Sequence, residues 1–202
     1  MEINLGPLQF DHKVVFRQLR QDLRDDWFRD PRDFQDVFNN RQIEEVISEN
    51  FFNNNGTYRP QRADLLNVPK PNFTLRYALE TGVADRALYH GLVAFLVPFY
   101  DPLLPWNVFS HRRSNDRDGD KYLFRNAISS WQDFLGVVQA SIKDGATLLS
   151  TDLTNYYENI DLSILKNTME GLLTEVHATE EEKECIRIHL LMLFECLKKW
   201  CY

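Results

Sequence analysis

The sequence predicts a mixed α+β fold that is rich in helices, with helical segments at both ends and a small antiparallel sheet between them. The first observation that favours this fold is the helical spacing of apolar residues before residue 55 and after residue 161. The second is a pair of short apolar runs around Pro69-Lys-Pro-Asn72, and the third is a β-branched, apolar run over residues 146–151. With 202 residues, 44% of them hydrophobic, the chain can bury a core as one domain or as two closely packed domains.

Composition and cysteine usage indicate a cytoplasmic protein without membrane association. No apolar run approaches the roughly 18 residues of a membrane span, and the polar start lacks the basic then apolar order of a signal peptide. The three cysteines, Cys185, Cys196 and Cys201, show no paired spacing for zinc, so we expect reduced thiols that serve packing. The five histidines are scattered without a metal-ligand spacing.

The net charge of −7 argues against nucleic-acid binding over the whole surface, because such binding depends on cations that displace counterions from phosphates. Residues 1–50 carry a net charge of −4, residues 51–150 carry +2 and residues 151–202 carry −5. The middle of the chain is therefore the place for a local phosphate-binding surface on an acidic body. A solvated charged face explains the same imbalance equally well.

The first 54 residues are expected to form helices. Asp11 is placed to cap the first helix, and Asp30-Pro31 starts a second one by the pattern of a cap followed by proline. The apolar positions of the first helix are Val14, Val15, Leu19 and Leu23, and those of a third helix are Ile43, Val46 and Ile47. Asn53-Asn-Asn-Gly56 then interrupts the helical pattern.

Two short strands, Leu65–Val68 and Leu75–Leu79, are predicted to form a hairpin within residues 64–80. Lys70 lies at the tip of this hairpin, and Arg76 lies on its return strand. Taken alone, these two cations are typical of the solvated charges that a surface hairpin carries.

A long apolar helix is expected from Ala84, with Asp85 as its cap and an end near Pro98. After a proline-rich turn, Ser130 is expected to cap a helix that ends at Gly145. The last helix opens with the capping-box pattern Thr179-Glu-Glu-Glu182. Its apolar stripe is typical of a buried core helix and consists of Ile186, Leu190, Leu193, Phe194 and Leu197.

The run Ala146–Thr151 predicts a mostly buried strand that delivers Asp152 to its end. Asp161 stands where a helix N-cap is expected, ahead of a helical pattern of apolar residues. A carboxylate at the mouth of a sheet is costly to leave unpaired, so Asp152 is a candidate ligand of a hard cation such as Mg²⁺. The alternative is a loop aspartate that caps a turn.

The run Asp152-Leu-Thr-Asn-Tyr-Tyr-Glu-Asn-Ile-Asp161 resembles the first catalytic motif of the reverse transcriptases, in which a metal-binding aspartate ends a palm strand and an aromatic pair follows. Upstream segments occur in the order of the fingers of bacterial reverse transcriptases, and among these the phage-defence enzymes resemble the chain most. These segments are Tyr58-Arg-Pro, Val68-Pro-Lys-Pro-Asn72, Arg76, Asp85-Arg-Ala-Leu-Tyr-His90 and Val108-Phe-Ser-His-Arg112. The resemblance covers approximately residues 55–170.

The resemblance implies an RNA-directed DNA polymerase of bacterial antiviral defence, which transfers dNTPs to a 3′ hydroxyl by a two-metal mechanism. Asp152 and the backbone carbonyl of Leu153 would hold Mg²⁺, or Mn²⁺ in its place. Tyr157 would stack under the incoming sugar and exclude a 2′ hydroxyl.

The resemblance also implies roles for four cations of the fingers. Lys70 and Arg76 would bind the triphosphate, with lysine as a point charge and arginine as a planar fork. Arg112 and Arg113 would grip the template backbone. The implied partners are an RNA template, a DNA or RNA primer, dNTPs, and the remainder of the polymerase in the same or another chain.

The Pro-Gln-Gly loop and the Tyr-x-Asp-Asp hairpin that continue the family pattern do not occur in the 202 residues. One aspartate cannot hold two metal ions, so the chain alone is expected to extend no primer. We therefore interpret the sequence as a right-hand polymerase fragment, with an N-terminal helical region (1–54), fingers (55–145) and the start of an incomplete palm (146–202). The alternative is a non-catalytic, polymerase-like module that binds RNA through its basic fingers or protein through its acidic helices.

Overall fold

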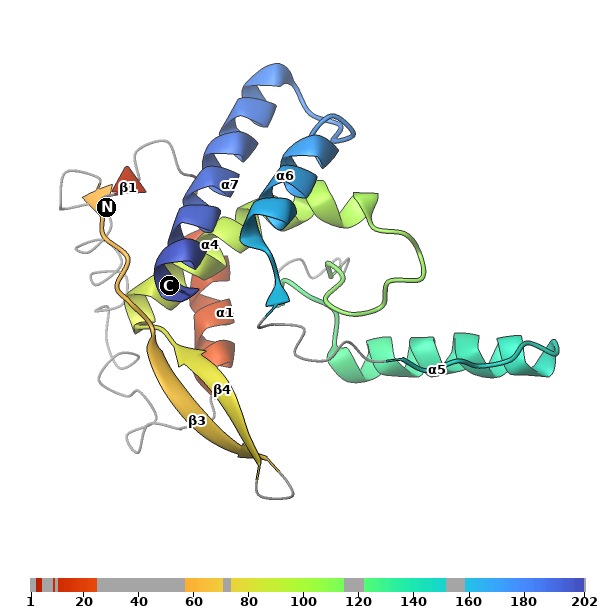
Figure 1. Ribbon diagram of the computed structural model, residues 1–202. Coiled ribbons are helices and arrows are strands. Elements are labelled where there is room, and N and C mark those ends of the chain that lie inside the picture. Colours follow the sequence, from red (N-terminus) through yellow and green to blue (C-terminus); the bar gives the residue numbers. More distant parts are fainter. Residues whose placement is uncertain are drawn as a thin grey trace. The chain divides into compact units, whose positions relative to one another are not determined.

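The computed structural model describes residues 3–4, 9, 11–24, 57–70, 74–114, 122–151 and 159–201. This part of the chain has an α+β fold, in which most residues are helical and two short pairs of strands are antiparallel (Figure 1). The chain divides into two compact units, the first made of Met1–Leu96 and Ala178–Tyr202 and the second of Val97–His177. The three regions predicted from the sequence, 1–54, 55–145 and 146–202, stay a prediction.

Helix α1 (His12–Arg24) begins where the sequence predicts. Asp11 Oδ1 accepts hydrogen bonds from the backbone N–H groups of Lys13 and Val14, at 2.9 and 3.2 Å. These two bonds satisfy donors that a helix start otherwise leaves open. The apolar side of α1 is buried in the first unit at Val15, Leu19 and Leu23. The two further helices predicted before residue 55 lie outside the described residues.

Helices α4 (Val83–Tyr100) and α7 (Glu180–Cys201) supply most of the remaining core of the first unit. The capping box of α7 forms as predicted, since Thr179 N–H donates to Glu182 Oε2 at 2.8 Å and Glu182 N–H donates to Thr179 Oγ1 at 3.2 Å. The buried side chains are Ala87, Leu88, Leu92 and Leu96 from α4, and Ile186, Leu190, Leu193, Phe194, Cys196 and Trp200 from α7. Of the helices in the described ranges, none has both the length and the apolar composition that a membrane span requires.

The prediction that Asp85 caps α4 is wrong. The helix starts at Val83, so Asp85 lies within its first turn. Its carboxylate accepts a hydrogen bond from the backbone of Gln61 instead of from its own helix. The Asp85 carboxylate, which the sequence pattern predicts to cap its own helix, therefore makes a tertiary contact instead.

Four strands form two antiparallel pairs in the first unit. Strand β1 (Ile3–Asn4) pairs with β2 (Thr57–Tyr58), and β3 (Asp64–Lys70) pairs with β4 (Thr74–Glu80). The second pair is the predicted hairpin, and its strands lie side by side in Figure 1. Val68 is buried on one face of this hairpin. The alternate positions expose a row of apolar side chains, which are Leu65, Leu75, Tyr77 and Leu79.

The second unit contains the short helix η3 (Asp101–Leu103), α5 (Ala127–Lys143) and α6 (Leu162–Leu172). Asp161 caps α6 as predicted. Its Oδ1 accepts hydrogen bonds from the backbone N–H groups of the second and third helical residues, at 2.8 and 3.1 Å.

The prediction that Ser130 caps α5 is wrong. The cap is Asn126, whose Oδ1 accepts hydrogen bonds from the N–H groups of Ile128 and Ser129, at 2.9 and 3.3 Å. Asparagine is as good an N-cap as serine, so the earlier of the two acceptors starts the helix and Ser130 becomes a buried residue of its first turn. After the helix ends, Gly145 adopts a φ of +88°, as the sequence leads one to expect of a glycine at a helix end.

The buried strand predicted over Ala146–Thr151 is not formed. These residues have no regular secondary structure and are exposed, with Leu148 at 59% and Leu149 at 83%. A buried strand must bond its N–H and C=O groups to a neighbouring strand. Each strand in the described part of the chain belongs to one of the two pairs of the first unit, so no pairing strand for this segment is present among the described residues.

Candidate functional site

Lys70 and Arg76, the predicted triphosphate ligands, both lie on the β3–β4 hairpin. Lys70 is the last residue of β3, and Arg76 lies on β4 opposite Val68. Because side chains alternate along a strand, the two positions belong to the face that carries Val68. The backbone therefore places both predicted ligands on one face of one hairpin.

The first end of the hairpin is held by Asp85, which is only 1% exposed. Its Oδ2 accepts a hydrogen bond of 3.2 Å from the N–H of Gln61, three residues before β3 begins. Burial raises the pKa of Asp85, and the hydrogen bond from Gln61 N–H together with the nearby polar groups of Trp200 and Tyr58 offsets this only in part. Burial, together with the negative charge of Asp85, also raises the pKa of Tyr58. The Asp85 carboxylate thus joins α4 to the segment before β3, and it lies beside Tyr58 of β2 and Trp200 of α7.

The second end of the hairpin is held by Arg86, the next residue of α4. Its Nε donates to the carbonyl of Thr81 at 3.2 Å, and its Nη2 lies 3.9 Å from Oε1 of Glu80, the last residue of β4. Arg86 Nη1 and His90 Nε2 each lie 3.5 Å from Asp22 Oδ2 on α1. Burial alone would raise the pKa of Asp22, but its contact with the His90 ring and the charges of His90 and Arg86 hold that pKa below its ordinary value.

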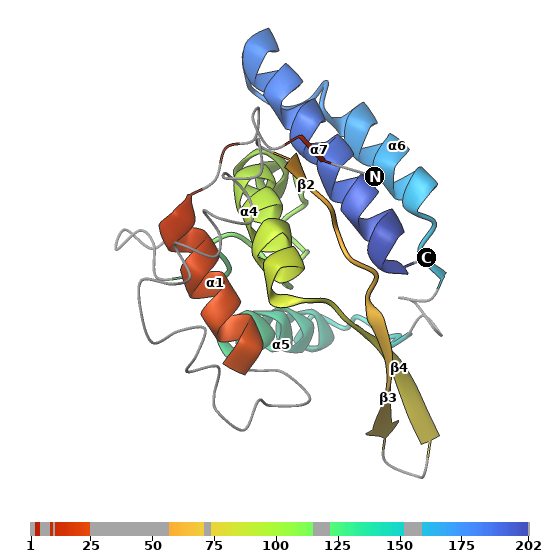
Figure 2. The same ribbon diagram turned by 90° about the vertical axis from the view of Figure 1, so that its left-hand side faces the viewer.

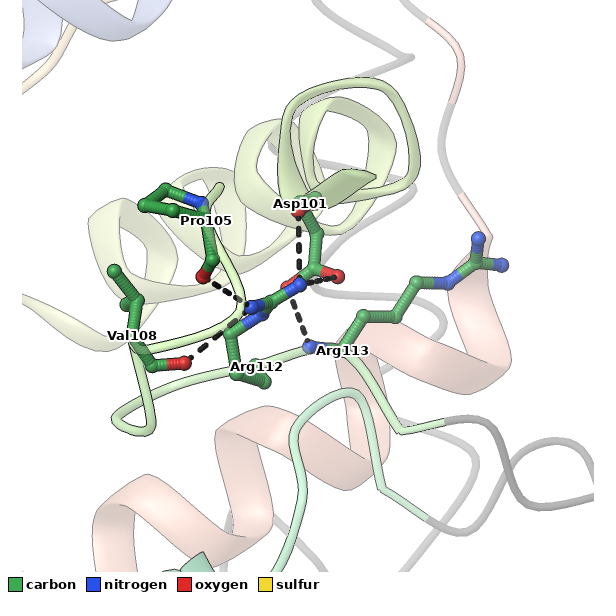
Figure 3. A network of polar contacts seen from close by, with 5 residues as sticks. All are labelled: Asp101, Pro105, Val108, Arg112 and Arg113. Atoms are coloured by element: carbon green, nitrogen blue, oxygen red, sulfur yellow. Dashed lines mark hydrogen bonds and ion pairs between the residues drawn. The ribbon is translucent and has the colours of Figure 1, made fainter. Parts of the chain in front are cut away.

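Arg112, a predicted template ligand, is committed to its own loop in the second unit (Figure 3). Its guanidinium makes five hydrogen bonds, as many as it has N–H groups. The acceptors are both carboxylate oxygens and the carbonyl of Asp101, at 2.9 to 3.3 Å, and the carbonyls of Pro105 and Val108, at 3.1 and 3.3 Å. A phosphate could therefore bind this guanidinium only if bonds within the loop were broken.

Asp101 is the centre of this network, although no sequence pattern singles it out. Besides Arg112, its Oδ1 accepts a hydrogen bond of 2.8 Å from the backbone N–H of Arg113. Burial acts to raise the pKa of Asp101, but the hydrogen bonds from Arg112 and Arg113 and the charges of Arg112 and Arg125 hold it below its ordinary value. The carboxylate is thus kept in its charged form by the cations around it.

Arg113, the other predicted template ligand, has an exposed side chain that points away from the network (Figure 3). Its backbone is fixed twice, by Asp101 and by an antiparallel bridge to Phe124. On either side of that bridge, Ser114 N–H donates to the carbonyl of Leu123 and Arg125 N–H donates to that of Arg112, both at 2.9 Å. Of the two arginines, Arg113 is the one whose cationic group remains available to a ligand.

The predicted catalytic run lies mostly outside the described residues. Asp152, Leu153 and Tyr157 belong to the undescribed residues 152–158, so their predicted roles stay predictions. The described flanks are the exposed residues before Asp152 and the cap Asp161 after it. Elsewhere in the described ranges, no three His, Cys, Asp or Glu side chains come together as a metal site.

His189 is buried in the first unit, where it serves packing. Its ring stacks on Phe95 with centroids 3.6 Å apart, Nε2 accepts from Gln9 N–H at 3.0 Å, and Nδ1 donates to the Cys185 carbonyl at 2.8 Å. Burial lowers the pKa of His189, although the two backbone hydrogen bonds act in the opposite direction. With one ring nitrogen accepting and the other donating, the ring is held neutral and has no free position for a metal.

Comparison with known proteins gives no relative for this arrangement. No family model matches the chain, and neither a curated protein nor a solved structure matches it significantly. The residues themselves and the motif resemblance are therefore the basis for assigning a function.

Proposed function

We propose that this chain is the fingers and first palm part of a bacterial reverse transcriptase, which transfers dNTPs to a 3′ hydroxyl on an RNA template in antiviral defence. The observation that carries the proposal is the hairpin, whose backbone brings the positions of Lys70 and Arg76 to one face. Two cationic positions on one face allow both residues to meet a single triphosphate. The run from Asp152 to Asp161, which ends in a helix cap, is its second support.

Each predicted residue has a role that follows from its chemistry. Lys70 and Arg76 bind the triphosphate by charge and by paired N–H groups. Tyr157 lies under the sugar, and Arg113, in place of Arg112, binds the template backbone. The carboxylate of Asp152 and the carbonyl of Leu153 are hard oxygen donors that suit Mg²⁺, which when bound neutralises charge on the transferred phosphate.

Primer extension by the complete polymerase tests this function through Asp152→Asn. The substitution keeps the shape of the side chain and removes its charge, so dNTP incorporation should fall by about a hundredfold to a thousandfold. The matched control is Asp144→Asn, which makes the same change at an exposed turn after α5 and should leave incorporation unaltered.

Unaltered incorporation by the Asp152→Asn enzyme would remove the metal role of Asp152. A wild-type polymerase that binds RNA but incorporates no nucleotide would favour the other interpretation, a non-catalytic module that uses the same fold for binding. Circular dichroism of each variant separates loss of chemistry from loss of folding.

A further inference from the structure

The tip of the β3–β4 hairpin lies far from its base, so a small rotation at the base produces a large displacement of the tip. Each strand has seven residues, so at about 3.3 Å per residue the tip lies roughly 23 Å from the base. Figure 2 shows the hairpin projecting beyond the end of α4. A rotation of about 10° at the base moves the tip by about 4 Å, which exceeds the length of a hydrogen bond.

The hairpin cannot fix its own orientation relative to the helices of the first unit. A two-stranded hairpin alone is marginally stable, and among the hairpin side chains that the structure describes, Val68 is the buried one. Its orientation must therefore come from contacts at its base, where the chain enters β3 and leaves β4.

Two consecutive residues of α4 make those contacts. Asp85 accepts from Gln61 N–H before β3, and Arg86 donates to the Thr81 carbonyl after β4 and lies close to Glu80. Neighbouring residues on a helix point about 100° apart, so one turn of α4 reaches both strand ends at once. The anchor extends to a second helix, because Arg86 also pairs with Asp22 of α1.

We propose that Asp85 and Arg86 are positioning residues: by holding the two strand ends they set the angle of the hairpin and thereby bring Lys70 and Arg76 to the triphosphate. The part that concerns the triphosphate rests on the proposed function, whereas the anchoring of the hairpin does not. In this role both residues act through the hairpin and not on the nucleotide itself.

Distance measurement between two spin labels tests the anchoring on the chain alone. Unnatural amino acids at Leu75 on β4 and Leu191 on α7 carry the labels, since both residues are exposed and belong to the first unit. Asp85→Ala and Arg86→Gln should each broaden the distance distribution, whereas Asp85→Asn, which retains an oxygen acceptor for Gln61 N–H, should stay as narrow as wild type. The control is Arg187→Gln, which breaks an exposed pair with Glu184 on α7.

If Asp85→Ala does not fold, Arg86→Lys decides the question. Lysine keeps the charge beside Asp22 but has one nitrogen in place of the separate Nε and Nη1 donors that reach Thr81 and Asp22, so it should broaden the distribution to an intermediate extent. Distributions as narrow as wild type in both Arg86 variants would overturn the anchoring.

Kinetics of the complete polymerase test the effect on the triphosphate. Arg86→Gln should raise the dNTP KM by about tenfold or more, with kcat and template affinity changed less than about twofold. An unchanged KM despite a broadened distribution would overturn the positioning role. A wild-type enzyme that uses no dNTP would instead reject the proposed function and leave the anchoring, which the labels measure without substrate.

Discussion

Asp85 in the first unit and Asp101 in the second are both withdrawn from solvent, but they are held in opposite ways. Asp85 is almost fully buried, and what it accepts comes from uncharged donors, chiefly a backbone N–H. Asp101 keeps 15% of its side chain exposed and faces a guanidinium that gives it two charged hydrogen bonds. Burial therefore raises the pKa of Asp85, whereas Arg112 and its neighbours lower that of Asp101.

This difference shows what each carboxylate contributes. In the network of Asp101 and Arg112, every N–H of the arginine has an acceptor. The stabilisation that this network provides depends on the charges of both side chains. The contact of Asp85 with Gln61 depends on an oxygen at the right place, which a neutral side chain can also provide. Substitutions that separate charge from shape should therefore affect the two sites differently.

The largest effect is expected from Asp101→Ala. The substitution leaves Arg112 only its three carbonyl acceptors and removes the acceptor of Arg113 N–H. Because an unpaired charge remains where both side chains are less than a fifth exposed, stability should fall by about 3 kcal/mol. Urea unfolding followed by circular dichroism measures this loss. Asp133→Ala, at an exposed position of α5, should change stability by less than about 0.5 kcal/mol, and an equal loss in both variants would reject the network.

A smaller effect is expected from Arg112→Lys. Lysine keeps the positive charge beside Asp101 but has three donors in place of five, so at least two of the acceptors lose their partner. The expected loss is about 1 to 2 kcal/mol in the same unfolding measurement. Arg113→Lys, whose side chain lies outside the network, should cost much less. If the two lysine variants are equally stable, charge alone holds the loop and the geometry of the guanidinium is irrelevant.

The parts of this fold that the sequence predicted correctly depend on neighbours in the chain. The caps Asp11 and Asp161 and the box at Thr179 are set by residues two or three positions away, and the hairpin by the turn between its strands. The failures depend on distant partners. Gln61 bonds to the carboxylate of Asp85, and the apolar run at Ala146–Thr151 pairs with no strand in the described part of the chain.

The residues of the candidate site show the same difference between local and distant determinants. The positions of Lys70 and Arg76 follow from the hairpin, which is local, so the sequence placed them on one element correctly. Arg112 bonds to Asp101, which lies eleven residues earlier in the chain. The loop between them has no helical or strand periodicity, so its conformation cannot be predicted from the sequence pattern. Two adjacent arginines look alike in sequence, and only the structure separates the one that holds the loop from the one that faces solvent.

The smallest effect, and the one that compares the two carboxylates directly, is a difference in pH dependence. The unfolded pKa of both groups is 3.8. Since the folded pKa of Asp101 is lower, its stabilisation is present above pH 3.8 and is lost as the pH falls through the folded pKa. Since the folded pKa of Asp85 is higher, its stabilisation is present below pH 3.8 and is lost as the pH rises through the folded pKa.

Urea unfolding at steps from about pH 3 to pH 7 measures this difference. The unfolding free energy of wild type minus that of Asp101→Asn should rise with pH, whereas the same difference for Asp85→Asn should fall with pH, each by less than about 1.4 kcal/mol per pH unit. Asp133→Asn, at an exposed position of α5, serves as the control. Parallel curves for Asp85→Asn and Asp101→Asn would mean that the cations around Asp101 do not distinguish it from a carboxyl group that is merely buried.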